Sequence, residues 1–145
     1  MSLDGTYDDA NVFAKIIRGE MPSVKVYEDD DVLAFMDVFP QSKGHTLVIP
    51  KRSKARNLLE VEPEVLQTLI LAVQKVAKAV RAAVNPDGVM VGQYNGAPSG
   101  QTIYHLHFHI IPRWEGQDIK GHSHGQMADI GELSELARTI SAKLG

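Results

Sequence analysis

Residues 104–111 have the sequence Tyr104-His105-Leu106-His107-Phe108-His109-Ile110-Ile111. Histidine alternates in this segment with apolar or aromatic residues, and side chains alternate between the two faces of a β-strand. The pattern therefore predicts a strand over residues 103–111 with all three histidines on one face. The rise of a strand places each histidine about 7 Å from the next. The residues between the histidines take the other face, where they can pack on a core.

Three explanations fit this row of imidazoles. The first is a polar strand face, although half of the six histidines fall within five residues and Thr, Lys or Glu is more usual at such positions. The second is a metal site, because imidazoles at i and i+2 with a third ligand can hold zinc. The third is catalysis at a phosphorus centre, since neutral imidazole is a nucleophile near pH 7 and its neighbours can donate hydrogen bonds to phosphoryl oxygens.

The loop before this strand favours the phosphorus centre. Residues 95–102 contain small residues, and their side-chain donors are Asn95, Ser99, Gln101 and Thr102. Exposed backbone N–H groups in such a loop suit a cluster of anionic oxygens. A glycine-rich stretch before a strand is usually only a turn, but here three histidines follow it.

Outward from this segment, periodicity predicts three helices and four more strands. The helices are residues 12–18, the long stretch 63–84, and a C-terminal helix that Asp129 can cap with Glu132 three positions on. The strands are residues 24–27, 32–38, 46–49 and 89–94. Helices and strands do not alternate as in a doubly wound fold. We therefore expect an α+β domain with a five-stranded antiparallel sheet, one long helix, and shorter N- and C-terminal helices.

Composition places further bounds on the protein. The 145 residues are 43% hydrophobic and 23% charged, as in one compact globular domain. The net charge of -3 does not favour nucleic acid or an anionic membrane as a partner. There is no cysteine, signal peptide or membrane-spanning apolar run, so we expect a cytoplasmic protein. Residues 1–10 are predicted to be a mobile tail, and residues 11–145 a single domain.

The chain resembles the histidine triad (HIT) family, specifically its Hint-like bacterial branch. Residues 105–111 match the alternating signature throughout, and the match continues upstream to residue 100. The other matching blocks are residues 12–22, residues 33–40, which match a nucleotide-binding segment, and residues 43–51, which carry the family's fourth histidine. The resemblance covers about residues 11–113 and implies the HIT-like fold.

The resemblance implies a hydrolase that cleaves purine nucleoside phosphoramidates or related adenylates by double displacement. His107 would attack the α-phosphorus and form a covalent nucleotidyl-histidine. The backbone carbonyl of His105 would hold its Nδ1–H, so that Nε2 attacks. His109 would hydrogen-bond the α-phosphate, and His45 would lie against the triad and order it.

The resemblance also implies the contacts of the nucleotide. Asp37 would accept hydrogen bonds from the ribose hydroxyls, a role that suits its two carboxylate oxygens. The contacts to phosphate or leaving group would come from Asn95, Gln101 and Thr102. An apolar slot for the base would be formed by Val12, Phe13, Ile16, Phe35 and Val38, although these five residues equally fit a plain core.

No cofactor is expected. Many bacterial members bind structural zinc through two cysteines and a histidine, and these positions are Asn11, Ala14 and Ser53 here, so we expect no metal and no structural zinc. His122 and His124 fit a solvated loop better than a metal site. Members of this branch are homodimers whose sheets join across a twofold axis, which implies a homodimer here. Two rival functions stay open: cleavage of dinucleoside polyphosphates by the same residues, and a non-catalytic nucleotide- or metal-binding module.

Overall fold

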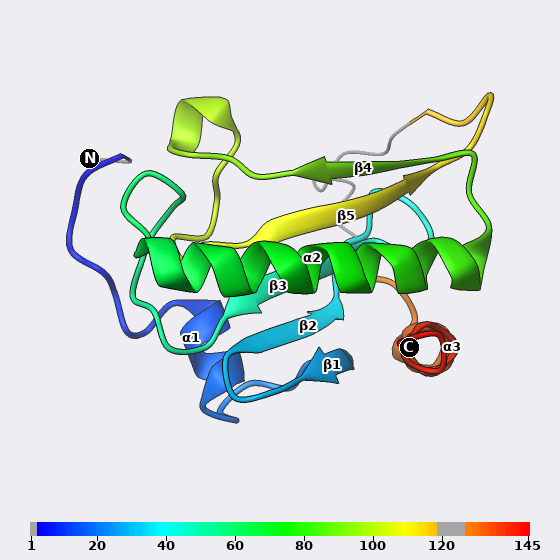
Figure 1. Ribbon diagram of the computed structural model, residues 1–145, viewed down its shortest axis with the longest axis horizontal. Coiled ribbons are helices and arrows are strands. Elements are labelled where there is room, and N and C mark those ends of the chain that lie inside the picture. The colour runs from blue at the N-terminus through cyan, green and yellow to red at the C-terminus, as the bar shows by residue number, and fades with distance from the viewer. Residues whose placement is uncertain (1–2, 119–126) are drawn as a thin grey trace.

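A five-stranded antiparallel sheet with the order β1-β2-β3-β5-β4 organises the computed structural model, which describes residues 3–118 and 127–145 (Figure 1). The strands are β1 (Lys25–Glu28), β2 (Val32–Met36), β3 (Thr46–Pro50), β4 (Gly88–Gly92) and β5 (Phe108–Arg113). The helices are α1 (Val12–Ile17), α2 (Pro63–Val84), α3 (Ile130–Ser141) and the short 3₁₀ helix η1 (Ala97–Ser99). The expected α+β fold is confirmed, and most boundaries agree within two residues. No helix in the described part of the chain is long and apolar enough to cross a membrane.

The apolar stripe of α2 forms the larger core with one face of the sheet. Figure 1 shows α2 lying across this face. Its buried residues recur every three or four positions, which places them on one side of the helix. The cluster joins Leu69, Val73, Val76 and Val80 of α2 to Ala34, Met36, Val48 and Ile110 of the strands. α3 packs beside α2 and β1 and completes this layer.

α1 covers the other face of the sheet. β2 is buried along its whole length, so its alternate residues enter both layers. Leu33 and Phe35 of β2 pack with Phe13 of α1 and with Leu47 and Ile49 of β3. The side chain of Asn11 accepts a hydrogen bond from the Ala14 N–H and so caps α1. This second cluster holds α1 close to the histidine segment.

The predicted strand over residues 103–111 is wrong in its first half, because β5 begins only at Phe108. β5 pairs with β3 from Ile110 back to Phe108, which lies opposite Val48. Two residues further along, β3 ends at Pro50, which has no N–H to donate to another ladder bond. β4 ends at Gly92 opposite His109, so neither neighbour continues the ladder beyond Phe108.

Residues 103–107 turn instead toward the loop that follows β3. The N–H of Leu106 donates to the carbonyl of Ala55 at 3.0 Å. The first two histidines therefore precede the strand, and only His109 lies within it. The even 7 Å spacing expected from an extended strand does not apply, and the ring centroids of His107 and His109 are 5.0 Å apart.

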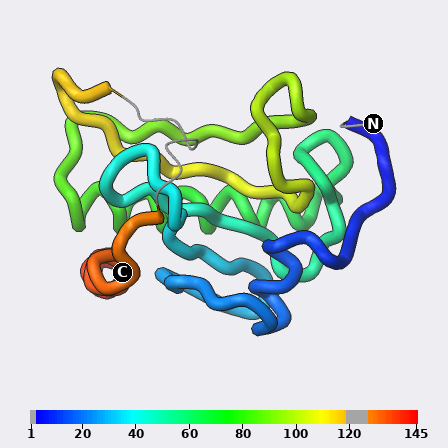
Figure 2. The backbone as a smooth tube through the Cα atoms, turned by 180° about the vertical axis from the view of Figure 1, so that it is seen from behind, coloured from blue at the N-terminus to red at the C-terminus, as the bar shows by residue number. Residues whose placement is uncertain are grey.

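The N-terminal segment before α1 lies beside the loop that follows β3 (Figures 1 and 2). The Lys54 ammonium is 3.3 Å from the Asp9 carboxylate. The Leu3 carbonyl accepts a hydrogen bond from the Arg56 guanidinium at 3.4 Å. These contacts fall within residues 1–10, for which the sequence predicts a mobile tail. His122 and His124 lie outside the described residues.

Candidate active site

A cavity of about 1200 Å³ opens beside the histidine segment. Its lining includes His107 and His109, with residues from α1, the end of β2, the loop around η1, and α3. Both histidines are nearly buried, at 8% and 4% exposure. A space of this size, with mostly apolar walls and a few polar groups, is typical of a small-molecule site.

The ring of His107 has a defined tautomer. Its Nδ1 lies 2.7 Å from the backbone carbonyl oxygen of His105. A carbonyl only accepts hydrogen bonds, so Nδ1 carries the proton and Nε2 of the neutral ring carries the lone pair. Phe13 packs edge-on against the His107 ring, with centroids 5.0 Å apart, and fixes its plane. The carbonyl contact expected from the sequence is therefore present, and it leaves the lone pair of the neutral ring on Nε2.

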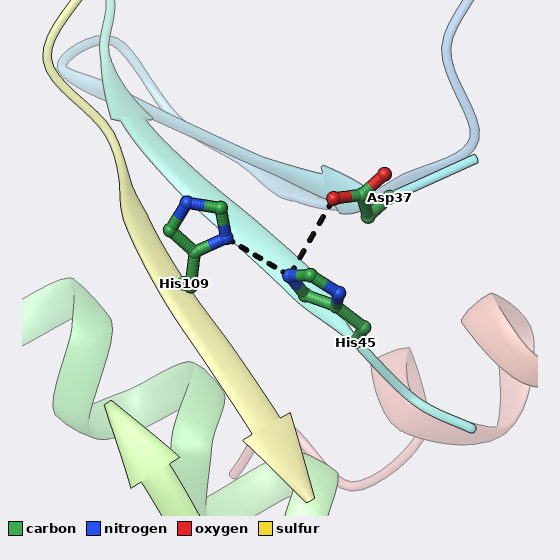
Figure 3. A group of neighbouring side chains, drawn as sticks. All are labelled: Asp37, His45 and His109. Carbon is green, nitrogen blue, oxygen red and sulfur yellow. Dashed lines mark hydrogen bonds and ion pairs between the residues drawn. The ribbon is translucent and has the colours of Figure 1, made fainter. Parts of the chain in front are cut away.

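A second chain of hydrogen bonds sets the tautomers of His45 and His109 (Figure 3). The backbone N–H of Gln41 donates to Nδ1 of His45 at 3.0 Å, so the proton of neutral His45 is on Nε2. This Nε2 lies 3.0 Å from Nδ1 of His109, to which it donates. Neutral His109 then carries its own proton on Nε2. His109 is therefore a hydrogen-bond donor in the lining of the cavity, and fully buried His45 orders it.

The carboxylate of Asp37 lies at the end of β2 and also lines the cavity. One oxygen accepts a hydrogen bond from the Phe39 N–H at 2.8 Å. The other lies 3.5 Å from Nε2 of His45 (Figure 3). The backbone N–H of Asp37 donates to the His45 carbonyl. Backbone and side-chain hydrogen bonds together therefore hold the carboxylate beside His45.

Asp37, His45 and His109 are close enough to one another to hold a metal ion. Metal binding would require the lone pair of His45 at Nε2 and the proton at Nδ1. Nδ1 instead faces the Gln41 N–H, so that tautomer would place two hydrogens against each other. The geometry therefore favours a hydrogen-bonded chain over a metal site here.

The three positions at which the family resemblance implies zinc ligands are occupied here by residues with other roles. Asn11 caps α1. The Ser53 hydroxyl donates to the Glu62 carboxylate at 2.7 Å and accepts from the Ala55 N–H. Ala14 offers no ligand atom.

His105 does not line the cavity and is 1% exposed. Its Nε2–H donates to the carbonyl of Pro50 at 2.9 Å. Its Nδ1 accepts from the hydroxyl of Tyr7 at 2.6 Å. Burial lowers the pKa of His105 to about 4, with a smaller contribution from His107, and the Pro50 carbonyl opposes the shift. His105 is therefore neutral at pH 7, and its buried ring ties the histidine segment to Pro50 and Tyr7.

The low pKa of His105 predicts acid destabilisation. Below pH 6.5 the unfolded chain binds a proton at His105, whereas the folded protein does not until about pH 4. The free energy of unfolding should fall by about 1.4 kcal/mol per pH unit across this window, about 3 kcal/mol in all. Urea unfolding of the wild type and of His105→Gln at several pH values measures the difference. Equal pH dependence of the two proteins would contradict the prediction.

Gln101 and Asn95 hold the loop before the histidines and do not line the cavity. The Gln101 amide donates to the carbonyls of Arg56 at 2.7 Å and Ile103 at 3.0 Å, and its oxygen accepts from the Gly96 N–H. The Asn95 oxygen accepts hydrogen bonds from residues 58 and 93. Of the three polar residues predicted to meet the phosphate, the structure brings only Thr102 to the cavity.

The apolar residues predicted to form a base slot line the cavity and also belong to the second core cluster or its margin. Phe13 and Phe35 are 5% and 3% exposed and pack edge to face, with centroids 5.4 Å apart. Val12 and Ile16 pack against this cluster, and Val38 packs against the larger core. All five line the cavity. The two interpretations of these residues are therefore compatible, since the outer surface of the core forms the wall.

Three residues that contribute to the site were not predicted from the sequence. Tyr7 lies in the segment predicted to be a tail, and no periodicity marks it. Gln41 acts through its backbone N–H, so its residue type carries no signal. Tyr94 lines the cavity with its ring 5.4 Å from that of His109, and in the sequence it resembled any aromatic strand residue.

Fold and site together define a class of protein: an α+β domain that gathers three histidines from one short segment beside a small-molecule cavity. The HIT domain family model matches residues 18–116. The chain belongs to the histidine triad family.

Relatives span the whole domain. The chain is 40% identical over 136 residues to "Protein hit" of Bacillus subtilis, covering 92% of this chain and 93% of that protein. It is 41% identical over 118 residues to "Adenylylsulfatase HINT3" of Arabidopsis thaliana, covering 77% of this chain and 59% of that protein. The crystal structure of a HIT-like protein from Bartonella henselae has a TM-score of 0.89 at 54% identity, covering 97% of this chain and all of that one.

Proposed function

We propose that the chain is a nucleotide hydrolase that cleaves purine nucleoside phosphoramidates or related adenylates at the α-phosphorus. The observation that carries this proposal is the 2.7 Å contact between Nδ1 of His107 and the His105 carbonyl. It keeps the nucleophilic lone pair on Nε2 in a residue that lines the cavity. An activated nucleophile allows one difficult displacement to proceed as two easier ones.

In the first step, Nε2 of His107 forms a bond to the α-phosphorus as the bond to the leaving group breaks. For a phosphoramidate, the leaving nitrogen takes a proton from solvent and departs as the free amine. The imidazole becomes positively charged, and the His105 carbonyl stabilises its Nδ1–H. Negative charge builds on the phosphoryl oxygens, where the Nε2–H of His109 donates a hydrogen bond. Water then breaks the phosphorus–nitrogen bond and releases the nucleoside monophosphate.

The rest of the cavity suits a nucleoside. Phe13, Ile16 and Phe35 offer an apolar wall for a purine base. Asp37 lines the same cavity and would accept hydrogen bonds from the ribose hydroxyls. Thr102 would contact the phosphate. The name of the Arabidopsis relative, an adenylylsulfatase, supports an adenylate as substrate.

A direct comparison of substrates tests this function. Adenosine phosphoramidate should be turned over faster than diadenosine polyphosphates, and intact-protein mass spectrometry with a slow substrate should detect one nucleotidyl group per chain. Faster cleavage of the polyphosphate would replace the proposed substrate. Tight binding of a nucleoside monophosphate without turnover of any adenylate would instead identify a nucleotide sensor.

The chemistry uses imidazole throughout, so we propose that activity needs no metal or other cofactor. Treatment with a chelator should leave turnover unchanged. Activity that is lost with a stoichiometric metal and restored by it would show a metal enzyme instead.

We also propose a homodimer that joins two sheets through β4. β4 lies at the edge of the sheet, where Val91 is 46% exposed beside a groove shared with α2. Ile70 and Leu71 of α2 are also exposed, at 43% and 65%. An unpaired strand edge beside apolar residues can pair with a second copy. Val91→Asp should convert the dimer to a monomer in sedimentation equilibrium, and an unchanged mass would contradict this interface.

A further inference from the structure

We propose that Tyr7 is a positioning residue that holds the His107 nucleophile in place through His105. The proposal rests on the function given above. The hydroxyl of Tyr7 lies 2.6 Å from Nδ1 of His105, 98 residues away in the sequence. Its ring packs edge-on against the His105 ring, with centroids 5.7 Å apart. The N-terminal segment therefore contacts His105, the histidine of the triad that does not line the cavity.

The direction of this hydrogen bond follows from the other partner of the ring. Nε2 of His105 faces the Pro50 carbonyl at 2.9 Å, so the single proton of the neutral ring is on Nε2. Nδ1 can then only accept, and the Tyr7 hydroxyl donates. Burial raises the pKa of Tyr7, so the hydroxyl keeps its proton at neutral pH. Tyr7 and Pro50 thus hold the ring of His105 from opposite ends.

The orientation of His105 matters because its own carbonyl holds Nδ1 of His107. Residues 103–107 lie outside β5 and have no ladder bonds to fix their backbone. The peptide group that carries the His105 carbonyl is held on one side by the Leu106 N–H, which donates to the Ala55 carbonyl at 3.0 Å. The hydrogen bonds of the His105 side chain to Tyr7 and Pro50 supply the further support that a strand would otherwise provide. Loss of the Tyr7 hydroxyl would free one end of the ring and loosen the carbonyl that aligns the nucleophile.

Tyr7 is itself held on both sides. Upstream, the Leu3 carbonyl accepts from the Arg56 guanidinium at 3.4 Å. Downstream, the Asp9 carboxylate lies 3.3 Å from the Lys54 ammonium, and the Asp9 carbonyl accepts from Arg18 at 2.8 Å. These contacts place the segment along the loop after β3 (Figure 2). Tyr7 does not line the cavity, so any effect on the reaction is indirect.

The test is Tyr7→Phe, which keeps the ring and removes only the hydroxyl. The rate of nucleotidyl-histidine formation in a single turnover should fall about five- to tenfold, the effect of one lost hydrogen bond to a buried group. The dissociation constant of adenosine monophosphate should stay within about twofold, since the lining is untouched. The ¹⁵N shift of Nδ1 in His105 should move away from that of a hydrogen-bonded acceptor, with the Nε2–H tautomer kept.

Tyr27→Phe is the matched control, because the Tyr27 hydroxyl donates to Asp29 in an exposed turn. It should change neither the rate nor the nitrogen shift. An unchanged rate in Tyr7→Phe, or weaker nucleotide binding in proportion to the slower rate, would overturn the positioning role. If the wild type forms no adduct with any adenylate, the proposed function fails. The nitrogen shift then still decides whether Tyr7 donates to His105.

Discussion

Replacement of His107 by alanine is expected to lower the turnover of adenosine phosphoramidate by about 10⁴-fold or more. Without the imidazole, no nucleotidyl-histidine can form, and water must attack the phosphorus directly. The ring lies at the wall of the cavity, 8% exposed, and its removal leaves the Phe13–Phe35 wall in place. Nucleotide binding should therefore persist. Measurements of kcat/KM and of adduct mass report the two effects separately.

Two further measurements distinguish loss of the nucleophile from loss of folded protein. His107→Ala should remain folded and unfold in one cooperative urea transition, because both hydrophobic clusters are formed without this ring. His107→Gly should recover part of its activity with added imidazole, which can enter the space left by the ring. Turnover within about tenfold of the wild type would exclude His107 as the nucleophile. An adduct on another residue of the variant would do the same.

His109→Ala is expected to lower kcat about 10²- to 10³-fold while still allowing slow adduct formation. The Nε2–H of His109 would stabilise negative charge that develops only as the phosphorus–nitrogen bond forms. Its loss should therefore raise the barrier more than it weakens substrate binding. Single-turnover kinetics beside a nucleotide-binding measurement check both parts.

His45→Gln provides the comparison for His109. His45 acts through the 3.0 Å hydrogen bond to Nδ1 of His109 and does not line the cavity. Its replacement should therefore cost less than the loss of His109, and the double variant should be no slower than His109→Ala alone. A multiplicative loss in the double variant would mean that the two histidines act independently. If His109→Ala weakens nucleotide affinity by as large a factor as it lowers kcat, then His109 does not act in the chemical step.

Much of the fold was accessible from local patterns. The stripe of α2 predicted residues 63–84 without error, because an apolar residue at every third or fourth position can be buried only as a helix face. β2 and β3 were predicted as short apolar runs bounded by turn residues, and both are buried along their whole length. The alternation rule failed at residues 103–107, where alternation is present but no neighbouring strand offers a ladder. A strand needs partners, and Pro50 at the end of β3 has no N–H to give.

Residue types also indicated the chemistry of the site. Three histidines beside Asp37 and His45 predicted imidazole chemistry, and the structure gathers the second and third histidines at one cavity. The side chains that would donate to a phosphate were harder to predict. Gln101, for example, donates its amide N–H groups to the carbonyls of Arg56 and Ile103. A polar side chain in a loop can face a ligand or the backbone, and sequence does not distinguish the two.

The amino-acid sequence determined the α+β class and most of the elements, and it singled out His107 as the candidate nucleophile, because these inferences depend on periodicity and residue chemistry. The roles of the imidazoles were decided by the tertiary structure. The tautomer of His105 depends on Tyr7 and Pro50, which lie 98 and 55 residues away in the sequence. That of His109 depends on His45, 64 residues away, whose own tautomer is set by the nearby Gln41 N–H. A proton on one ring nitrogen rather than the other is set by such neighbours. Three similar histidines therefore acquire the different roles that we propose for them, a support, a nucleophile and a donor, only once the chain has folded.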